Sequence, residues 1–164
     1  MTVTNEVQRA IALRAEKKYE ESNELLKHLA DTNLTDAYIQ YQCAWSYDVL
    51  GEEAKAVPHY EAAIQGGLQE DDLQRAYLGL GSTYRALGEY QDSERIFEEA
   101  LTKFPNHQAL STFYAMTLYN LGQHNQAIQL LLKTLIDTTS DQGVKDYAPA
   151  LSFYAEHLDE TWKS

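Results

Sequence analysis

The chain has 164 residues, and 13 Lys and Arg against 25 Asp and Glu give it a formal net charge of −12. This length fits one domain or one compact repeat array, and so acidic a chain is a poor partner for nucleic acid or an anionic membrane, because phosphates attract Lys and Arg. One Cys cannot form an internal disulfide, and the first residues lack the basic start and apolar run of a signal peptide, so we expect a soluble, cytoplasmic protein.

Hydrophobic periodicity indicates helices throughout the chain. Apolar residues recur at spacings of three and four residues, as in Ile96, Ala100 and Phe104. The sequence has no alternating β-branched runs bounded by turn residues, which strands would require. We therefore predict an all-α fold.

Three Leu-Gly pairs mark turns between the predicted helices. Gly88 and Gly122 lie 34 residues apart, and Gly51 lies 37 residues before Gly88, which is one period plus a three-residue insertion. Glycine just past a helix end adopts positive φ and caps the last carbonyls, so each pair predicts a helix-to-helix turn. A fixed period of this length is typical of arrays of stacked helix pairs.

In chain order, this period divides the sequence into four helix pairs and a terminal helix. The predicted ranges are 3–36 (a degenerate copy), 37–70, 74–107 (the best copy), 108–141 and, for the terminal helix, 142–164. The best copy carries its pattern in Tyr77, Leu80, Gly81, Tyr84, Gly88, Tyr90, Ser93, Phe97, Ala100 and Pro105. Asp36, Asp72 and Asn106 stand where N-caps are needed.

The best copy resembles the tetratricopeptide repeat (TPR), W-x₂-L-G-x₂-Y…A-x₃-F…P, with Tyr in place of Trp and Ser in place of Ala. The resemblance covers residues 3–141. It implies a single array over 1–164, a right-handed α-α superhelix (TPR solenoid) of about four helix pairs with a C-terminal capping helix. The chain resembles short stand-alone bacterial TPR proteins without a catalytic domain. That implies a protein–protein interaction scaffold that binds a peptide segment or helix in its concave groove.

The first helix of each pair lines the concave face of such arrays, and helical geometry selects the side chains that it presents. The candidate groove residues are Tyr38, Tyr41, Trp45, Asp48, Arg75, Leu78, Arg85, Met116 and Tyr119. Tyr38, Tyr41 and Trp45 form an aromatic stripe suited to anchoring a ligand. Packing of this stripe beneath the flanking helices is the alternative.

The predicted groove is also locally basic. It holds Arg14, Arg75 and Arg85 against Asp48, a net charge of +2 in an acidic chain, which favours an acidic peptide with an aromatic or apolar anchor. Weak ion pairs between these arginines and nearby aspartates are the alternative. The clamp by which some TPR proteins hold chaperone tails needs Lys and Asn at positions that mostly hold other residues here, so chaperone-tail binding is not predicted.

No pattern in the sequence makes a convincing active site, so we expect neither catalysis, nor a cofactor, nor a metal. The five His lack metal-binding spacing, and Cys43 aligns with core positions of other copies. The glycine-containing segment 79–83 lacks the Lys and the spacing of a phosphate-binding loop.

The alternative function is structural and concerns the terminal helix. We expect this helix to begin near Tyr147, after an N-cap at Asp146, and it carries Tyr154, Leu158 and Trp162. Exposed aromatic residues of this kind often mark interfaces. A homodimer formed through the terminal helix is therefore the alternative to peptide binding, and the sequence does not decide between them.

Overall fold

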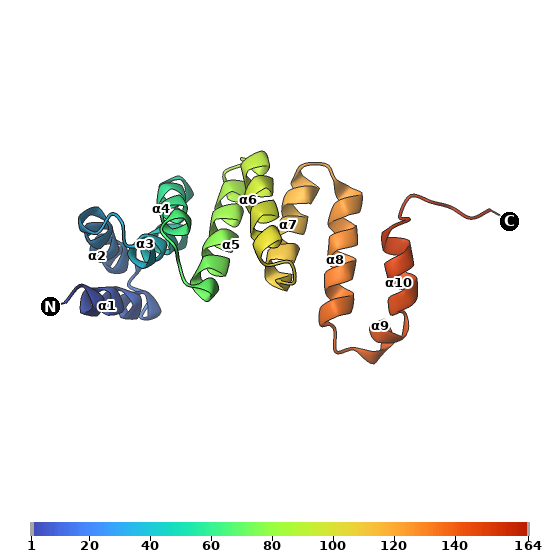
Figure 1. Cartoon of the computed structure of the whole chain (residues 1–164), viewed down its shortest axis with the longest axis horizontal. Helices are drawn as coiled ribbons and strands as arrows, with labels where there is room; N and C mark the ends of the chain where they lie inside the picture. The colour runs from blue at the N-terminus through green and yellow to red at the C-terminus, as the bar shows by residue number, and fades with distance from the viewer. Residues whose placement is uncertain (1, 164) are drawn as a thin grey trace. The chain divides into compact units, whose positions relative to one another are not determined.

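The computed structural model describes residues 2–163, which form ten α-helices and no strand (Figure 1). The helices are α1 (Val3–Ala15), α2 (Tyr19–Thr32), α3 (Ala37–Val49), α4 (Glu53–Gln65), α5 (Glu70–Ala86), α6 (Tyr90–Lys103), α7 (Gln108–Asn120), α8 (His124–Thr138), α9 (Gln142–Asp146) and α10 (Ala148–Ala155). The predicted all-α architecture is confirmed for the described residues. The chain divides into two compact units, one up to Ile96 and one from Phe97 onward.

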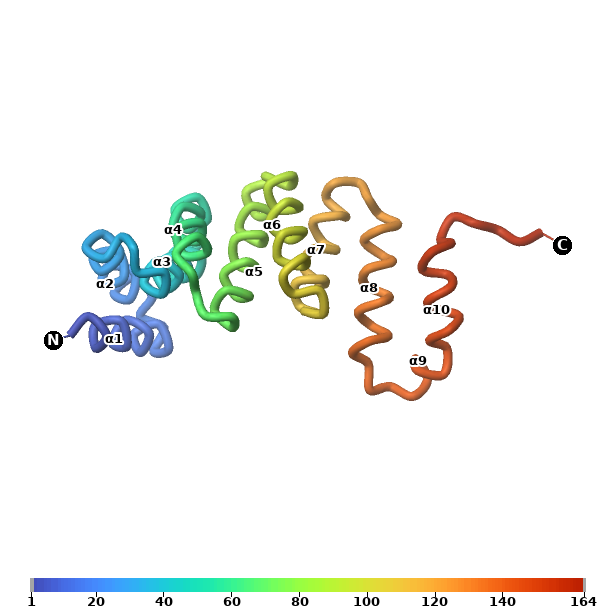
Figure 2. Tube along the Cα trace, viewed as in Figure 1, coloured from blue at the N-terminus to red at the C-terminus, as the bar shows by residue number. Residues whose placement is uncertain are grey.

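In the first unit, successive helices pack on one another. The pairs α1–α2 and α3–α4 are in contact, α2 packs on α3, and α4 packs on α5. Contacts also join α1 to α3 and α3 to α5, which brings the first helices of three successive pairs together (Figure 2). The largest fully buried side chains of this unit include Leu26, Ile39, Leu80 and Tyr77.

Serine replaces alanine at one packing position of the repeat, and the structure shows why this is tolerated. Ser22 and Ser93 occupy the same position in their copies, and both are fully buried. The Ser22 hydroxyl donates to the carbonyl of Ala10 at 2.7 Å, and the Ser93 hydroxyl donates to the carbonyl of Gly81, also at 2.7 Å. Each serine thus keeps the small volume that the contact needs and gives its polar atom a partner inside the protein.

The predicted Leu-Gly turns are confirmed. Gly51, Gly88 and Gly122 have φ of 70°, 79° and 78°, and each follows the leucine that caps a helix. Lys17 stands at the equivalent position of the first copy and has φ of 63°. The degenerate copy therefore keeps the turn geometry without the residue that adopts it most easily.

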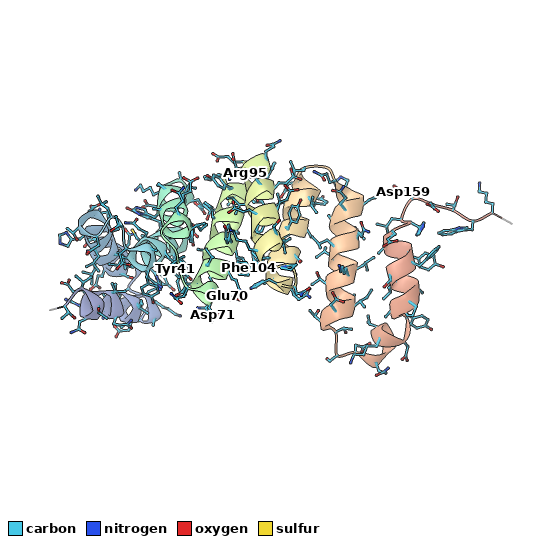
Figure 3. All side chains as sticks on the ribbon, in the orientation of Figure 1. Tyr41, Glu70, Asp71, Arg95, Phe104 and Asp159 are labelled. Carbon is cyan, nitrogen blue, oxygen red and sulfur yellow. The ribbon has the colours of Figure 1, made fainter. Side chains whose placement is uncertain are left out.

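Of the three N-caps predicted for the repeats, one is correct. The Asp36 carboxylate accepts a hydrogen bond of 3.0 Å from the Ile39 N–H at the start of α3. Asp72 is not a cap, because α5 already begins at Glu70 (Figure 3). The inserted acidic residues lie in the first turn of α5, where the helix dipole stabilises negative charge. The Asn106 prediction is also wrong: the His107 Nδ1 accepts from the Leu110 N–H at 3.2 Å.

The second unit consists of the end of α6 with α7, α8, α9 and α10. Both α7, which precedes α8 in the chain, and α10, which follows it, pack on α8. The predicted bounds of the capping helix, 142–164, are wrong: α10 ends at Ala155, and residues 156–163 are not helical. Tyr147, rather than Asp146, is the N-cap residue, and Pro149 lies in the first turn, where its missing N–H costs no helical hydrogen bond.

Candidate functional site

A pocket of about 530 Å³ lies among the first helices of three successive pairs, entirely within the first unit. Its lining residues come from α1, the start of α2, α3 and α5; we call it the Trp45 pocket, and it is lined by Ile11, Arg14, Ala15, Tyr19, Tyr38, Gln42, Trp45, Val49, Asp72 and Arg75. The predicted groove residues Tyr38, Trp45 and Arg75 therefore share one concave site. Tyr38 and Trp45 expose 36% and 39% of their surface, so both rings are available to a ligand.

Arg14, in the last turn of α1, is held in place by residues of α3. Its guanidinium lies over the Trp45 ring, with Cζ 3.8 Å from the ring centroid. Nη2 donates to the Gln42 side-chain oxygen at 2.5 Å, and Nη1 lies 3.5 Å from the Gln42 carbonyl. A guanidinium stacked on indole and anchored at one edge is oriented before any ligand arrives, which lowers the entropic cost of binding an anion.

The charges around the pocket favour an anion. Burial lowers the pKa of Arg14, while the neighbouring Tyr41 and Tyr38 act in the opposite direction, and a guanidinium remains charged under physiological conditions. Arg75 is exposed at the start of the second turn of α5. Asp72, one turn earlier, is the one acidic residue that lines the pocket within the part of the chain that the structure describes. The pocket therefore carries two cations and one anion.

Tyr41 does not line the pocket, although it lies between Tyr38 and Trp45 in the predicted stripe. It is 4% exposed, and its ring packs against Trp45 at 6.1 Å and against Tyr60 of α4 at 6.4 Å, measured between ring centroids. Burial raises the pKa of the Tyr41 hydroxyl. The aromatic stripe therefore has two roles. Tyr41 belongs to the core and packs beneath Tyr38 and Trp45, which line the pocket.

Asp48 likewise does not line the pocket, and its carboxylate joins neighbouring helices. Its carboxylate accepts from the Tyr60 hydroxyl at 2.7 Å and from the Thr83 hydroxyl at 3.0 Å, so it joins α3, α4 and α5. Burial raises the pKa of Asp48, and these two hydrogen bonds partly oppose that shift. A Cβ on Gly79 would lie 2.5 Å from the Tyr60 hydroxyl, so only glycine lets α5 approach Tyr60 this closely.

The remaining predicted groove residues lie outside the pocket. Leu78 and Arg85 are half-buried on α5 and do not line it. Met116 and Tyr119 belong to α7 in the second unit, where Tyr119 is 64% exposed and its ring lies 5.0 Å from that of His124. The basic groove predicted from sequence thus narrows to the Trp45 pocket.

Sequence reasoning missed two features of this pocket. Gln42 is an ordinary polar residue in the sequence, and only the contact with Arg14 shows that it orients a cation. Asp72 was assigned to a helix end, so its place at the pocket wall was not predicted. No local signal in the sequence marks either role, because both depend on contacts between helices.

The three residues predicted for self-association are exposed in the second unit. Leu158 and Trp162 lie beyond α10, and Tyr154 lies on it. The Trp162 ring is 5.9 Å from Tyr154 and 5.7 Å from Phe153, a residue that the prediction did not include. Trp162 reaches these rings because the chain leaves the helix after Ala155 and turns.

The described residues offer little for other chemistry. No group of three His, Cys, Asp or Glu in residues 2–163 could hold a metal ion. Burial raises the pKa of the Cys43 thiol to about 12, which suppresses the reactive thiolate. Between residues 2 and 163, no helix has both the length and the apolar character needed to cross a bilayer.

Comparison with solved structures gives the same fold. YrrB, a TPR protein with an unusual peptide-binding site, aligns over 94% of this chain and 78% of its own, with a TM-score of 0.69 and 15% sequence identity. The MamA RS-1 ArsTM double mutant aligns over 96% of both chains, with a TM-score of 0.71 and 12% identity. At such low identities these similarities establish the fold alone.

Sequence comparison identifies the family. Superkiller protein 3 of Saccharomyces cerevisiae is 23% identical over 106 residues, which is 60% of this chain but 7% of the yeast protein. The family described as Tetratrico peptide repeat matches residues 37–158, which extend from α3 past the end of α10. The chain therefore belongs to the tetratricopeptide-repeat family of protein–protein interaction scaffolds.

Proposed function

We propose that this chain is a non-catalytic cytoplasmic adaptor that binds an extended peptide segment in the Trp45 pocket. The ligand presents a large apolar or aromatic side chain to Tyr38 and Trp45, and a carboxylate to Arg14 and Arg75. The observation that carries the proposal is the orientation of Arg14 by Trp45 and Gln42 beside exposed aromatic surface. A cation fixed in this way adds a directed hydrogen-bond donor to an aromatic anchor, which is the combination found at interface hot spots.

The relatives support a peptide ligand in a general way. YrrB, which shares the fold, has an unusual peptide-binding site, and the family is one of interaction scaffolds. The surface charge supports an acidic ligand. In a chain of net charge −12, a pocket with net charge +1 is a local exception that attracts carboxylates which the remaining surface repels.

Binding can be measured by fluorescence anisotropy of a labelled synthetic peptide that carries Trp two residues after Glu. We expect Trp45→Ala to weaken binding at least about 10-fold, and Arg14→Ala to do the same for the Glu peptide but not for its Gln analogue. Leu87→Ala and Arg9→Ala are matched controls. Leu87 is 38% exposed, and Arg9 is an exposed arginine of α1; neither lines the pocket. Equal binding by pocket variants and controls would refute the proposal.

A second candidate function is self-association through the terminal region. It is favoured by the exposure of Phe153, Tyr154 and Trp162, which show 49%, 51% and 59% of their surface and touch one another. A symmetric dimer would bury this cluster against its copy in the partner. Light scattering of the Trp45→Ala variant tests this candidate, because a dimer through the terminal region does not need the pocket and should persist above the monomer mass of 18.7 kDa.

A further inference from the structure

The chain itself contains a segment with the chemistry that the Trp45 pocket selects. Residues 156–163, which we call the acidic tail, leave α10 without continuing the helix. Asp159 accepts a hydrogen bond from the Asn125 side chain at the start of α8, which fixes the base of the tail (Figure 3). Beyond this anchor lie Glu160 and Trp162, both exposed.

The charge of the acidic tail is opposite to that of the pocket. The tail holds Glu156, Asp159 and Glu160 against Lys163, a net charge of −2, whereas the pocket has a net charge of +1. Most of the remaining surface is acidic and repels the negative charge of the tail. A locally cationic site on a second copy is therefore an electrostatically favoured place for it.

The spacing of side chains in the tail also suits the pocket. In an extended chain, residues two apart point to the same side and lie about 7 Å from one another. The Trp162 ring rests on Phe153 and Tyr154 of its own chain, and it must leave them to bind elsewhere. Once it does so, Glu160 and Trp162 can face one surface together. The pocket presents a guanidinium and two exposed rings side by side, with Arg14 resting on Trp45. An indole that packs against the exposed surface of Tyr38 and the exposed edge of Trp45 leaves a carboxylate within reach of Arg14 or Arg75.

We propose that the acidic tail of one copy occupies the Trp45 pocket of a second copy. This inference rests on the proposed function, since it names a partner for the same pocket. The contact is heterologous, joining two different surfaces, so it generates rings or open chains instead of a self-complementary pair. An external peptide that enters the pocket competes with the tail and dissociates the assembly. The chain's own tail would then set the affinity that a partner must exceed.

Two variants of the full chain test this arrangement by mixing. The first, Trp45→Ala with Arg75→Glu, removes the pocket and keeps the tail. The second, Glu160→Lys with Trp162→Ala, removes the tail contacts and keeps both the pocket and the Asp159 anchor. All four residues are exposed, so we expect both variants to fold, which far-UV circular dichroism checks. Arg9→Ala with Tyr147→Ala, two exposed residues outside both surfaces, is the control.

Analytical ultracentrifugation over a concentration series gives the readout. We expect the wild type and the control to associate, each variant alone to remain an 18.7 kDa monomer, and their mixture to form a 1:1 complex through the one intact pocket and the one intact tail. Each variant should weaken self-association at least about 10-fold. Self-association of the pocket variant alone would overturn the proposal in favour of a dimer through the terminal aromatic residues. A monomeric wild type, or a mixture that does not associate, would overturn it as well.

A peptide experiment separates failure of this inference from failure of the proposed function. The tail variant is titrated with a labelled peptide of residues 156–163 and, separately, with the unrelated Glu and Trp peptide described above. Binding of both peptides supports both proposals. Binding of the unrelated peptide alone overturns the tail as a partner and leaves the pocket's function intact. Binding of neither overturns both.

Discussion

Leu26 and Leu131 occupy the same position in the first and last copies of the repeat, yet one is fully buried and the other is 38% exposed. Tyr60 and Phe97, at the same position in the two middle copies, are 3% and 0% exposed. The repeat pattern therefore selects the side chain for a core, but the helix that follows must supply the other half of that core. α2 has α3 packed on it, whereas α10 leaves Leu131 open.

The exposed face of α8 extends along the helix. Ile128, Leu131 and Leu135 are spaced three and four residues apart and expose between 38% and 44% of their surface. Among its residues only Ala127 is buried, although α7 and α10 both pack against this helix. The last copy of the array thus differs from the others because its apolar side chains stay partly exposed, although its sequence pattern is the same.

The largest expected effect comes from truncating the two leucines. Leu26→Ala should lower the free energy of unfolding by about 2–5 kcal/mol, because it empties a site that is fully buried. Leu131→Ala should cost less than about 1 kcal/mol, since its side chain already contacts solvent. Urea unfolding followed by far-UV circular dichroism measures both. Equal losses would mean that Leu131 is covered in solution, and the comparison between the two ends would no longer hold.

A second test uses pH, because packing between repeats in the first unit includes the partly buried carboxylate of Asp48. Its pKa is raised on folding, so the folded chain holds this proton more tightly than the unfolded chain does. Asp48 therefore adds stability below the unfolded value of 3.8, and this stability is lost as the pH rises through the folded pKa. Asp48→Asn stays neutral, so relative to wild type it should be better tolerated at neutral pH than below pH 3.8.

Urea unfolding at these two pH values, with wild type and variant side by side, checks the sign. Asp71→Asn, which alters an exposed aspartate of the same unit, is the matched control. If the difference in stability between Asp48→Asn and wild type were independent of pH, the pKa of Asp48 would not be raised on folding. The cross-repeat contact of Asp48 with Tyr60 and Thr83 would then contribute no pH dependence to the first unit.

The smallest expected effect concerns the turn of the degenerate first copy. Lys17 holds a positive φ where the other copies have glycine, and an L-residue there costs about 1–2 kcal/mol. Lys17→Gly removes this cost but adds freedom to the unfolded chain, so we expect a net gain of about 0.5 kcal/mol. Lys18→Gly is the control and should destabilise, since φ there is −88°. A loss of stability for Lys17→Gly in the same urea experiment would show that the lysine side chain contributes to the turn.

The sequence predicted the helix pairs and their turns because both depend on local chemistry. The apolar period fixed the helices, and glycine at Gly51, Gly88 and Gly122 fixed the turns through the φ that each must adopt. The predicted helix ends were wrong where a neighbouring residue could take the same role or where the apolar spacing ran past the end of the helix. His107 caps α7 in place of its neighbour Asn106, and the terminal helix stops at Ala155 although its apolar spacing continues.

The candidate site was only partly predictable from the sequence, because helical spacing names a face without naming what covers it. Tyr41 and Trp45 lie one turn apart on α3, yet Tyr60 of α4 packs against Tyr41 and buries it, while Trp45 stays open. The position of Arg14 over Trp45 joins residues 31 apart in sequence, and Gln42 fixes it. By itself the sequence determined which helices form and which side chains are available. The tertiary structure decided which of them are covered, because burial depends on neighbours that are distant in the chain.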